Sequence, residues 1–188
     1  MSRIQIEGEN AEHIVREMQN SVLRFYEGFP NVRYEDIRNV IASVENRIAY
    51  SFISFNYTDT LDRCIQLVKE RVSETIGKHQ CRSTVYTDFL GDVLHIHGTT
   101  RDGLVLGVND ESQVDNERLC ANELNRQCMI KTEANERLGE NKIRDAKRLI
   151  DGSVIICVFG MSIGATDKLW WEHICEWLLG ADKRRLII

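Results

Sequence analysis

Three apolar segments of strand length end abruptly in polar or small residues, and each end carries its own sequence. These ends read Ser-Phe-Asn-Tyr-Thr-Asp over residues 54–59, His-Ile-His-Gly over 95–98 and Phe-Gly-Met-Ser-Ile-Gly-Ala-Thr-Asp over 159–167. In open α/β sheets, ligands bind at the carboxyl edge of the strands. The sequence therefore predicts a site that is assembled from loops, as in a binding or catalytic domain.

Helical and strand-like patterns alternate along the chain, which predicts an α/β fold with a mostly parallel sheet and flanking helices. Helical spacing of apolar residues extends over 11–26, 34–48, 61–76, 142–150 and 167–178, and strand-like runs lie at 50–55, 92–96, 103–108, 153–159 and 185–188. Since the run 153–159 is apolar throughout, we expect a central parallel strand that is buried on both faces. We expect the three tryptophans at 170, 171 and 177 to pack rather than to form a stacking platform.

The two ends of the chain predict a partial domain. With one proline (Pro30) and no linker-like segment, residues 1–188 read as a single domain. The chain begins with a helical pattern and ends where an apolar strand starts, at 185–188. We therefore expect a domain that is truncated at both ends and lacks the first strand that such a sheet usually has.

Charge and cysteine spacing exclude several classes of protein. A net charge of -5 argues against a nucleic-acid binder, which would normally show a basic face. The six cysteines have no CxxC spacing, so neither a zinc knuckle nor a disulfide framework is indicated, and we expect several of them to be small buried hydrophobes. With no apolar run of membrane-spanning length and no signal peptide, the sequence predicts a cytoplasmic protein without a membrane partner.

Residues 110–138 form a polar segment of mixed charge. A partly helical, solvated surface is the reading that we favour, because charge mixing suits a wet helix face. The alternative is an insertion that covers the site or contacts a partner.

Two of the strand ends offer candidate catalytic side chains. Asn56 could hydrogen-bond a sugar hydroxyl or a water, or could cap the helix that follows it. His97 precedes Gly98 at a strand end, where an imidazole could act as a base near neutral pH. We expect His95 to be a satisfied core histidine, and two histidines alone do not make a metal site.

The third strand end contains Gly160-x-Ser162-x-Gly164, which matches the nucleophile elbow of serine hydrolases. In that class a histidine follows the serine, and here only His173 does, on the helix directly downstream. The pattern therefore favours a glycine-permissive loop whose backbone amides, together with a helix N-terminus at Thr166, bind an anion such as phosphate. Asp167 also suits the first turn of that helix through its dipole.

The order of these motifs, with Gly-Val-Asn-Asp at 107–110 between the second and the third, resembles the AbiH family of bacterial phage-abortive-infection proteins. More distantly it is similar to sirtuin-like domains that bind nicotinamide adenine dinucleotide (NAD). The resemblance implies a Rossmann-like sheet and a sirtuin-like nucleotide site, with Asn56 and His97 as catalytic residues that flank the nicotinamide ribose. It also implies that Gly98, Gly160, Ser162 and Asp167 help to bind the nucleotide.

The sequence departs from this resemblance in two features. The N-terminal nucleotide-loop strand of the family, with the Gly-Asn-Gly-Phe-Asp-like loop that would cradle the diphosphate, is missing. The sirtuin zinc module is missing as well, which argues against protein deacylation. Three alternatives therefore stay open: a defence effector that hydrolyses NAD, a non-catalytic module that senses a nucleotide or a phage protein, and a degenerate remnant. Self-association and a phage-derived trigger stay open as well.

Overall fold

The computed structural model describes residues 8–101, 103–104, 107–108, 111–130, 133, 141–161, 163–164 and 167–188. The chain divides into two compact units, of which unit 1 comprises residues 1–52 and 59–93 and unit 2 comprises residues 53–58 and 94–188. The first and third strands along the chain begin in unit 1 and end in unit 2. No helix among the described residues is both long and apolar enough to cross a membrane.

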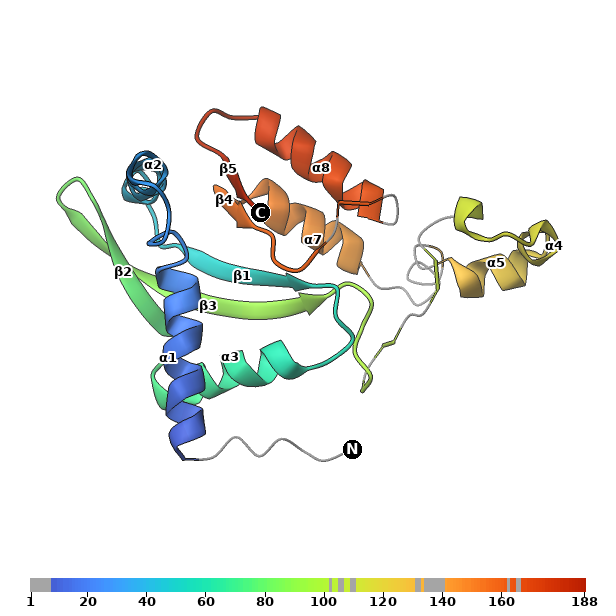
Figure 1. Ribbon diagram of the computed structural model, residues 1–188, viewed down its shortest axis with the longest axis horizontal. Helices are drawn as coiled ribbons and strands as arrows, with labels where there is room; N and C mark the ends of the chain where they lie inside the picture. Colours follow the sequence, from blue (N-terminus) through green and yellow to red (C-terminus); the bar gives the residue numbers. More distant parts are fainter. Residues whose placement is uncertain are drawn as a thin grey trace. The chain divides into compact units, whose positions relative to one another are not determined.

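Unit 1 is built on a three-stranded sheet with helices packed against it (Figure 1). Its elements are α1 (Glu9–Leu23), α2 (Asn31–Ala42), β1 (Ala49–Ser54), α3 (Thr60–Arg71), β2 (Thr75–Cys81) and β3 (Thr84–His95). The strand order is β1-β3-β2. β2 pairs antiparallel with β3, whereas Ile48 O accepts from Phe89 N and Ser54 O from Ile96 N, so that β1 and β3 run parallel. The sheet is therefore mixed.

The core of unit 1 lies between α1, α3 and the sheet, and α1 contacts both α3 and β2. Its buried members are Val15, Val22, Ile65, Val68, Ile76 and Leu90. Ile76 belongs to β2, so the prediction that the third helix extends to residue 76 is wrong: α3 ends at Arg71. β2 has no clear strand pattern in the sequence, because a register shift at its start and the inward-facing His79 interrupt the alternation of apolar residues.

Unit 2 joins the ends of β1 and β3 to the C-terminal half of the chain. Its other elements are α4 (Glu117–Cys120), α5 (Glu123–Met129), α7 (Lys142–Asp151), β4 (Ile155–Cys157), α8 (Lys168–Leu179) and β5 (Arg185–Ile187), with a 3-10 turn at Glu111–Gln113. β4 and β5 pair in parallel. Trp170, Trp171, Ile174 and Trp177 of α8 are buried against α7 and Ile96, which confirms that the tryptophans pack into a core.

The α/β class is confirmed, but a mostly parallel Rossmann-like sheet is not, because the three-stranded sheet is mixed. The prediction that 153–159 is buried on both faces is wrong. Within 153–159 only Ile155–Cys157 is a strand, and Cys157 is exposed. In the part of the chain that the structure describes, β5 is the one strand paired with it. Phe159, the last residue of the expected strand, is 100% exposed.

The polar segment 110–138 is helical in part, as expected, over α4 and α5. Asn122 caps α5, since its side-chain oxygen accepts from the backbone N–H groups of Leu124 and Asn125. No residue of α5 is buried, as a solvated helix requires. The strand expected at 103–108 lies partly outside the described residues, and Val108 makes a single bridge with Ile130.

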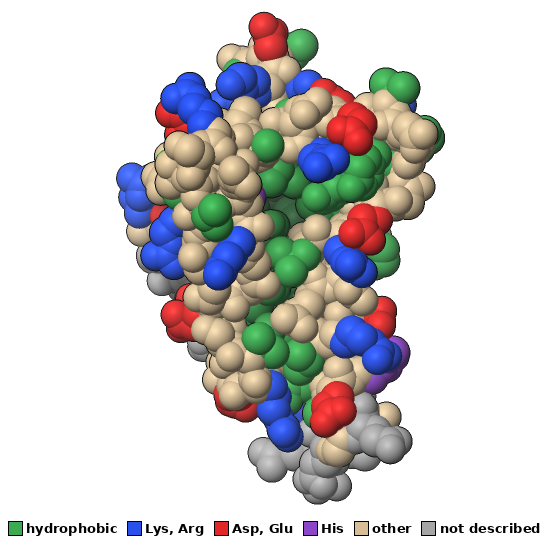
Figure 2. Space-filling model, turned by 90° about the vertical axis from the view of Figure 1, so that its left-hand side faces the viewer, with side chains coloured by type: hydrophobic (Ala, Val, Ile, Leu, Met, Phe, Trp, Pro, Cys, Tyr) green, Lys and Arg blue, Asp and Glu red, His purple; other side chains and the backbone are tan. Residues whose placement is uncertain are grey.

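Both signs of charge are interspersed on the face drawn in Figure 2, with hydrophobic side chains visible between them. The free cysteines differ in exposure: Cys81 is buried, whereas Cys128, Cys157 and Cys175 are exposed. Of these four, only Cys81 is the small buried hydrophobe that we expected.

Tyr50 of β1 gives unit 1 a predicted sensitivity to alkali. Burial, and then the nearby Asp88 carboxylate, raise the pKa of Tyr50 to about 12, from about 10 in an unfolded chain. The folded state therefore holds this proton more tightly than the unfolded state. The contribution of Tyr50 to the free energy of unfolding is therefore constant below about pH 10 and falls between about pH 10 and about pH 12, by up to about 1.4 kcal/mol per pH unit.

Urea unfolding of the wild type and of Tyr50→Phe at about pH 9 and about pH 11 measures this effect. We expect Tyr50→Phe to lose less stability than the wild type between the two conditions, because phenylalanine keeps the ring and removes the titrating group. Equal losses in the two proteins would contradict the prediction.

Candidate functional site

The first two motifs follow parallel, adjacent strands and so meet at one edge of the sheet. β1 ends at Ser54 and β3 ends at His95, and Ile96 N donates to Ser54 O at 3.1 Å. Asn56 and His97 therefore each lie two residues beyond a strand end, within unit 2. The structure thus places the backbones of these two predicted catalytic residues at the same edge of the sheet, as their positions in the sequence suggest.

The loops after β1 and β3 are joined by two further hydrogen bonds. Nδ1 of His95 donates to the backbone oxygen of Asn56 at 3.1 Å, and Thr100 N donates to Tyr57 O at 2.8 Å. In addition, the backbone N–H of Asn56 donates to the hydroxyl of Ser54 at 3.2 Å. The backbone around Asn56 is thus fixed from both sides, while the residue itself is exposed.

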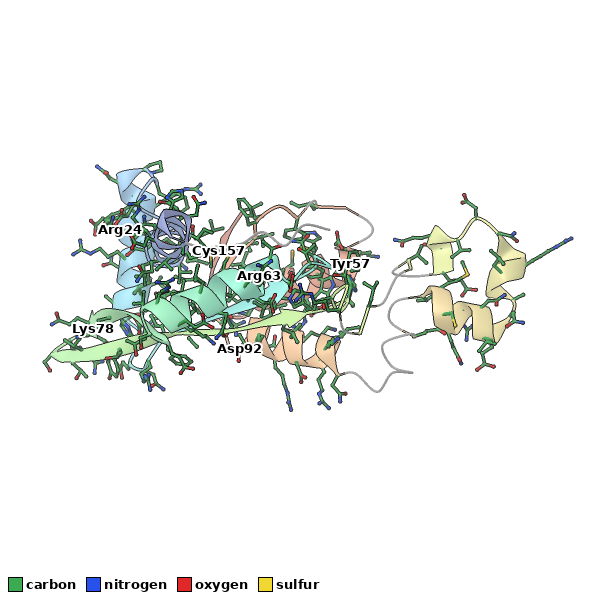
Figure 3. All side chains as sticks on the ribbon, turned by 90° about the horizontal axis from the view of Figure 1, so that it is seen from below. Arg24, Tyr57, Arg63, Lys78, Asp92 and Cys157 are labelled. Carbon is green, nitrogen blue, oxygen red and sulfur yellow. The ribbon has the colours of Figure 1, made fainter. Side chains whose placement is uncertain are left out.

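His97 lies in an aromatic setting at the base of these loops and is only 7% exposed. The centroid of its ring is 5.9 Å from that of Phe55, which it meets edge-on, and 6.0 Å from that of Tyr57. Phe55 in turn makes an edge contact with Trp170 at 5.3 Å. Figure 3 labels Tyr57 in the loop that follows β1. The core of unit 2 therefore sets the position of the His97 ring through Phe55.

Gly98 follows His97 in a conformation that favours glycine. Its φ is 67° and the residue is buried, with its N–H donating to His95 O at 3.4 Å. A side chain at this position would be strained, because residues other than glycine rarely adopt positive φ. Gly98 thus turns the chain sharply away from β3, a local role that is independent of any ligand.

The structure tests two predictions from the sequence, that Asn56 caps a helix and that His95 is a satisfied core residue. Asp59, not Asn56, occupies the N-cap position of α3, so Asn56 is not the helix cap and its exposed side chain has no such structural role. His95 is satisfied by its bond to Asn56 O, but it is half-buried and not a core residue.

The third loop begins from the same core as the first two. Val158 and Met161 pack against the cluster that contains Ile96 and is flanked by Phe55. Gly160 between them has φ 67° and open space where a Cβ would lie. Asp167 occupies the N-cap position of α8, and its N–H donates to Gly164 O at 3.2 Å. Ser162 and Thr166 lie outside the described residues.

Phe55 and Tyr57 were not predicted as site residues, although the sequence carried a signal for them. They flank Asn56 directly in Phe-Asn-Tyr, and a strand-end asparagine between two aromatic residues is suited to line an amphipathic ligand site. Among the described residues, no three His, Cys, Asp or Glu side chains gather as a metal site would require.

The family of bacteriophage abortive infection AbiH proteins matches residues 2–188, which is essentially the whole chain. The chain belongs to the AbiH family. The resemblance seen in the motifs is thereby confirmed, and membership in AbiH implies a role in bacterial defence against phage. No curated protein and no solved structure matches the chain.

Proposed function

We propose that this AbiH-family chain is a phage-defence effector whose unit 2 binds NAD and hydrolyses it. The observation that supports this most is the pair of Asn56 and His97, which follow parallel strands of one sheet with Asn56 exposed and His97 held among aromatic rings. The carboxyl edge of parallel strands is where α/β proteins bind nucleotides.

In the proposed reaction the bond between the ribose C1′ and the nicotinamide nitrogen breaks through an oxocarbenium-like state. Nicotinamide leaves with the bonding electron pair, and a water oxygen bonds to C1′, which yields ADP-ribose and one proton. His97 accepts a proton from a ribose hydroxyl and returns it once the water has bonded to C1′, so the net proton released comes from the water. Asn56 positions the water or the ribose. The nonpolar walls formed by Phe55 and Tyr57 keep bulk water from the ring of His97.

The third loop takes the phosphates in this proposal. Gly160, with positive φ and no steric obstacle near it, allows a close approach of backbone to ligand, and α8 presents its N-terminus directly after the loop. In this proposal Gly98, Ser162 and Asp167 also belong to the sirtuin-like nucleotide site that the family resemblance implies.

The direct test is incubation of the purified protein with NAD, with nicotinamide and ADP-ribose separated by chromatography. We expect both products in equal amounts. Binding of NAD without either product would contradict the hydrolase and favour a nucleotide sensor, and the absence of both binding and turnover would contradict the nucleotide site itself.

A second candidate function is a non-catalytic module that contacts a phage protein through α4 and α5. Two exposed leucines support it, since Leu119 of α4 is 39% and Leu124 of α5 is 57% exposed. Exposed leucines on a solvated surface are the kind of residue that an interface buries. Loss of phage protection in Leu119→Ser/Leu124→Ser, with NAD turnover retained, would favour this function over the first.

A further inference from the structure

His95 makes a side-chain contact that no catalytic role explains. Its Nδ1 lies 3.1 Å from the backbone oxygen of Asn56, on the loop that follows the neighbouring strand. His95 is the last residue of β3, so its backbone is fixed by the sheet, whereas Asn56 lies beyond the end of β1. The bond therefore runs from an anchored residue to the loop that carries the proposed catalytic amide.

The geometry determines which atom of His95 carries a proton. A backbone carbonyl oxygen only accepts hydrogen bonds, so Nδ1 must donate. The N–H at Nδ1 is present both in the neutral tautomer that this bond selects and in the imidazolium ion. A proton at Nδ1 that is held in a bond to a carbonyl suits a structural tether and does not suit a proton carrier at this atom.

We propose that His95 is a positioning residue, which holds the backbone of Asn56 so that its amide stays at the ligand edge of the sheet. This inference rests on the proposed function for its catalytic consequence. The contact with Asn56 itself is independent of any ligand, so it can be tested without one.

A matched pair of variants isolates the donated hydrogen. In His95→Asn, the side-chain amide can place an N–H close to the position of Nδ1. In His95→Asp, the side chain has nearly the shape of asparagine, but an ionised carboxylate can only accept a hydrogen bond. Only the second variant sets an acceptor against the Asn56 carbonyl. Thermal unfolding of both variants shows whether unit 2 stays folded.

The first readout is amide hydrogen exchange of the segment 53–58 without ligand. We expect faster exchange in His95→Asp and near-wild-type exchange in His95→Asn. Equal exchange in the two variants would overturn the tether, whatever the outcome with NAD.

The second readout is NAD hydrolysis, which separates positioning from chemistry. We expect His95→Asp to lower kcat by about three- to tenfold with little change in KM, as loss of one neutral hydrogen bond allows, and His95→Asn to keep most activity across the pH range. An inactive His95→Asn would overturn the proposal and place His95 in the chemistry. A wild type without turnover would overturn the proposed function, and hydrogen exchange would still decide the tether.

Discussion

His97→Ala is expected to lower kcat for NAD hydrolysis by about 10²–10⁴-fold, the usual loss when a general base is removed. The physical reason is that the ribose hydroxyl no longer has an acceptor for its proton as positive charge develops at C1′. Product formation from NAD, followed by chromatography at saturating substrate, measures this effect. Activity within a few fold of the wild type would remove His97 from the mechanism.

Because His97 is buried, the variant needs controls for folding. Its ring contacts Phe55 and Tyr57, so alanine leaves a gap in the aromatic packing. His97→Gln fills more of this space without supplying the same base, and we expect it to be comparably inactive with a smaller change in melting temperature. His13→Ala, at an exposed position on α1 in unit 1, is the matched histidine control and should be fully active.

The sequence was informative about the site because strand ends are marked by a change in composition. Asn56 and His97 were predicted from such ends, and the parallel pairing of β1 with β3 places both at one edge. What local pattern does not contain is the bond from His95 to the Asn56 backbone, since it joins residues 39 positions apart. The contact of Phe55 with both His97 and Trp170 is equally non-local.

The fold was less predictable where polar residues face inward. β3 was expected only over 92–96 but extends over Thr84–His95, and β2 was not expected at all. Both strands carry a buried titratable residue, His79 in β2 and Asp88 in β3, which a hydrophobicity pattern reads as a break. The hydrogen bonds between His79 and Asp88 allow both side chains to be buried, and they can be recognised only from the folded structure.

His79 and Asp88 form a buried pair in unit 1 that is joined by hydrogen bonds. Nδ1 of His79 lies 2.8 and 3.0 Å from the two carboxylate oxygens of Asp88, and Nε2 lies 3.0 Å from Val44 O. The backbone N–H of Ile48 also donates to Asp88 at 3.0 Å. Their side chains are only 4% and 2% exposed. Both ring nitrogens of His79 and both carboxyl oxygens of Asp88 are thus hydrogen-bonded inside unit 1.

This pair ties together four segments of unit 1, which explains why breaking it should be costly. It links the chain after α2, the approach to β1, β2 and β3, and the His79 ring also stacks on Tyr86 at 5.3 Å. Asp88→Ala leaves Nδ1 of the buried His79 without its hydrogen-bond partner. We expect it to lower the free energy of unfolding of unit 1 by about 3–5 kcal/mol, the usual cost of removing one partner of a buried pair.

Asp92→Ala provides the matched control on the same strand, because Asp92 (Figure 3) is 94% exposed and contacts only the Lys69 ammonium among the ion pairs of the described residues. Its effect should be small, as for other surface pairs. All three tryptophans lie in α8 of unit 2, so tryptophan fluorescence during urea unfolding reports on unit 2 and far-ultraviolet circular dichroism on both units. We expect Asp88→Ala to move the circular dichroism transition to lower urea more than the fluorescence transition. An Asp88→Ala protein as stable as Asp92→Ala would show that the buried pair does not hold unit 1 together.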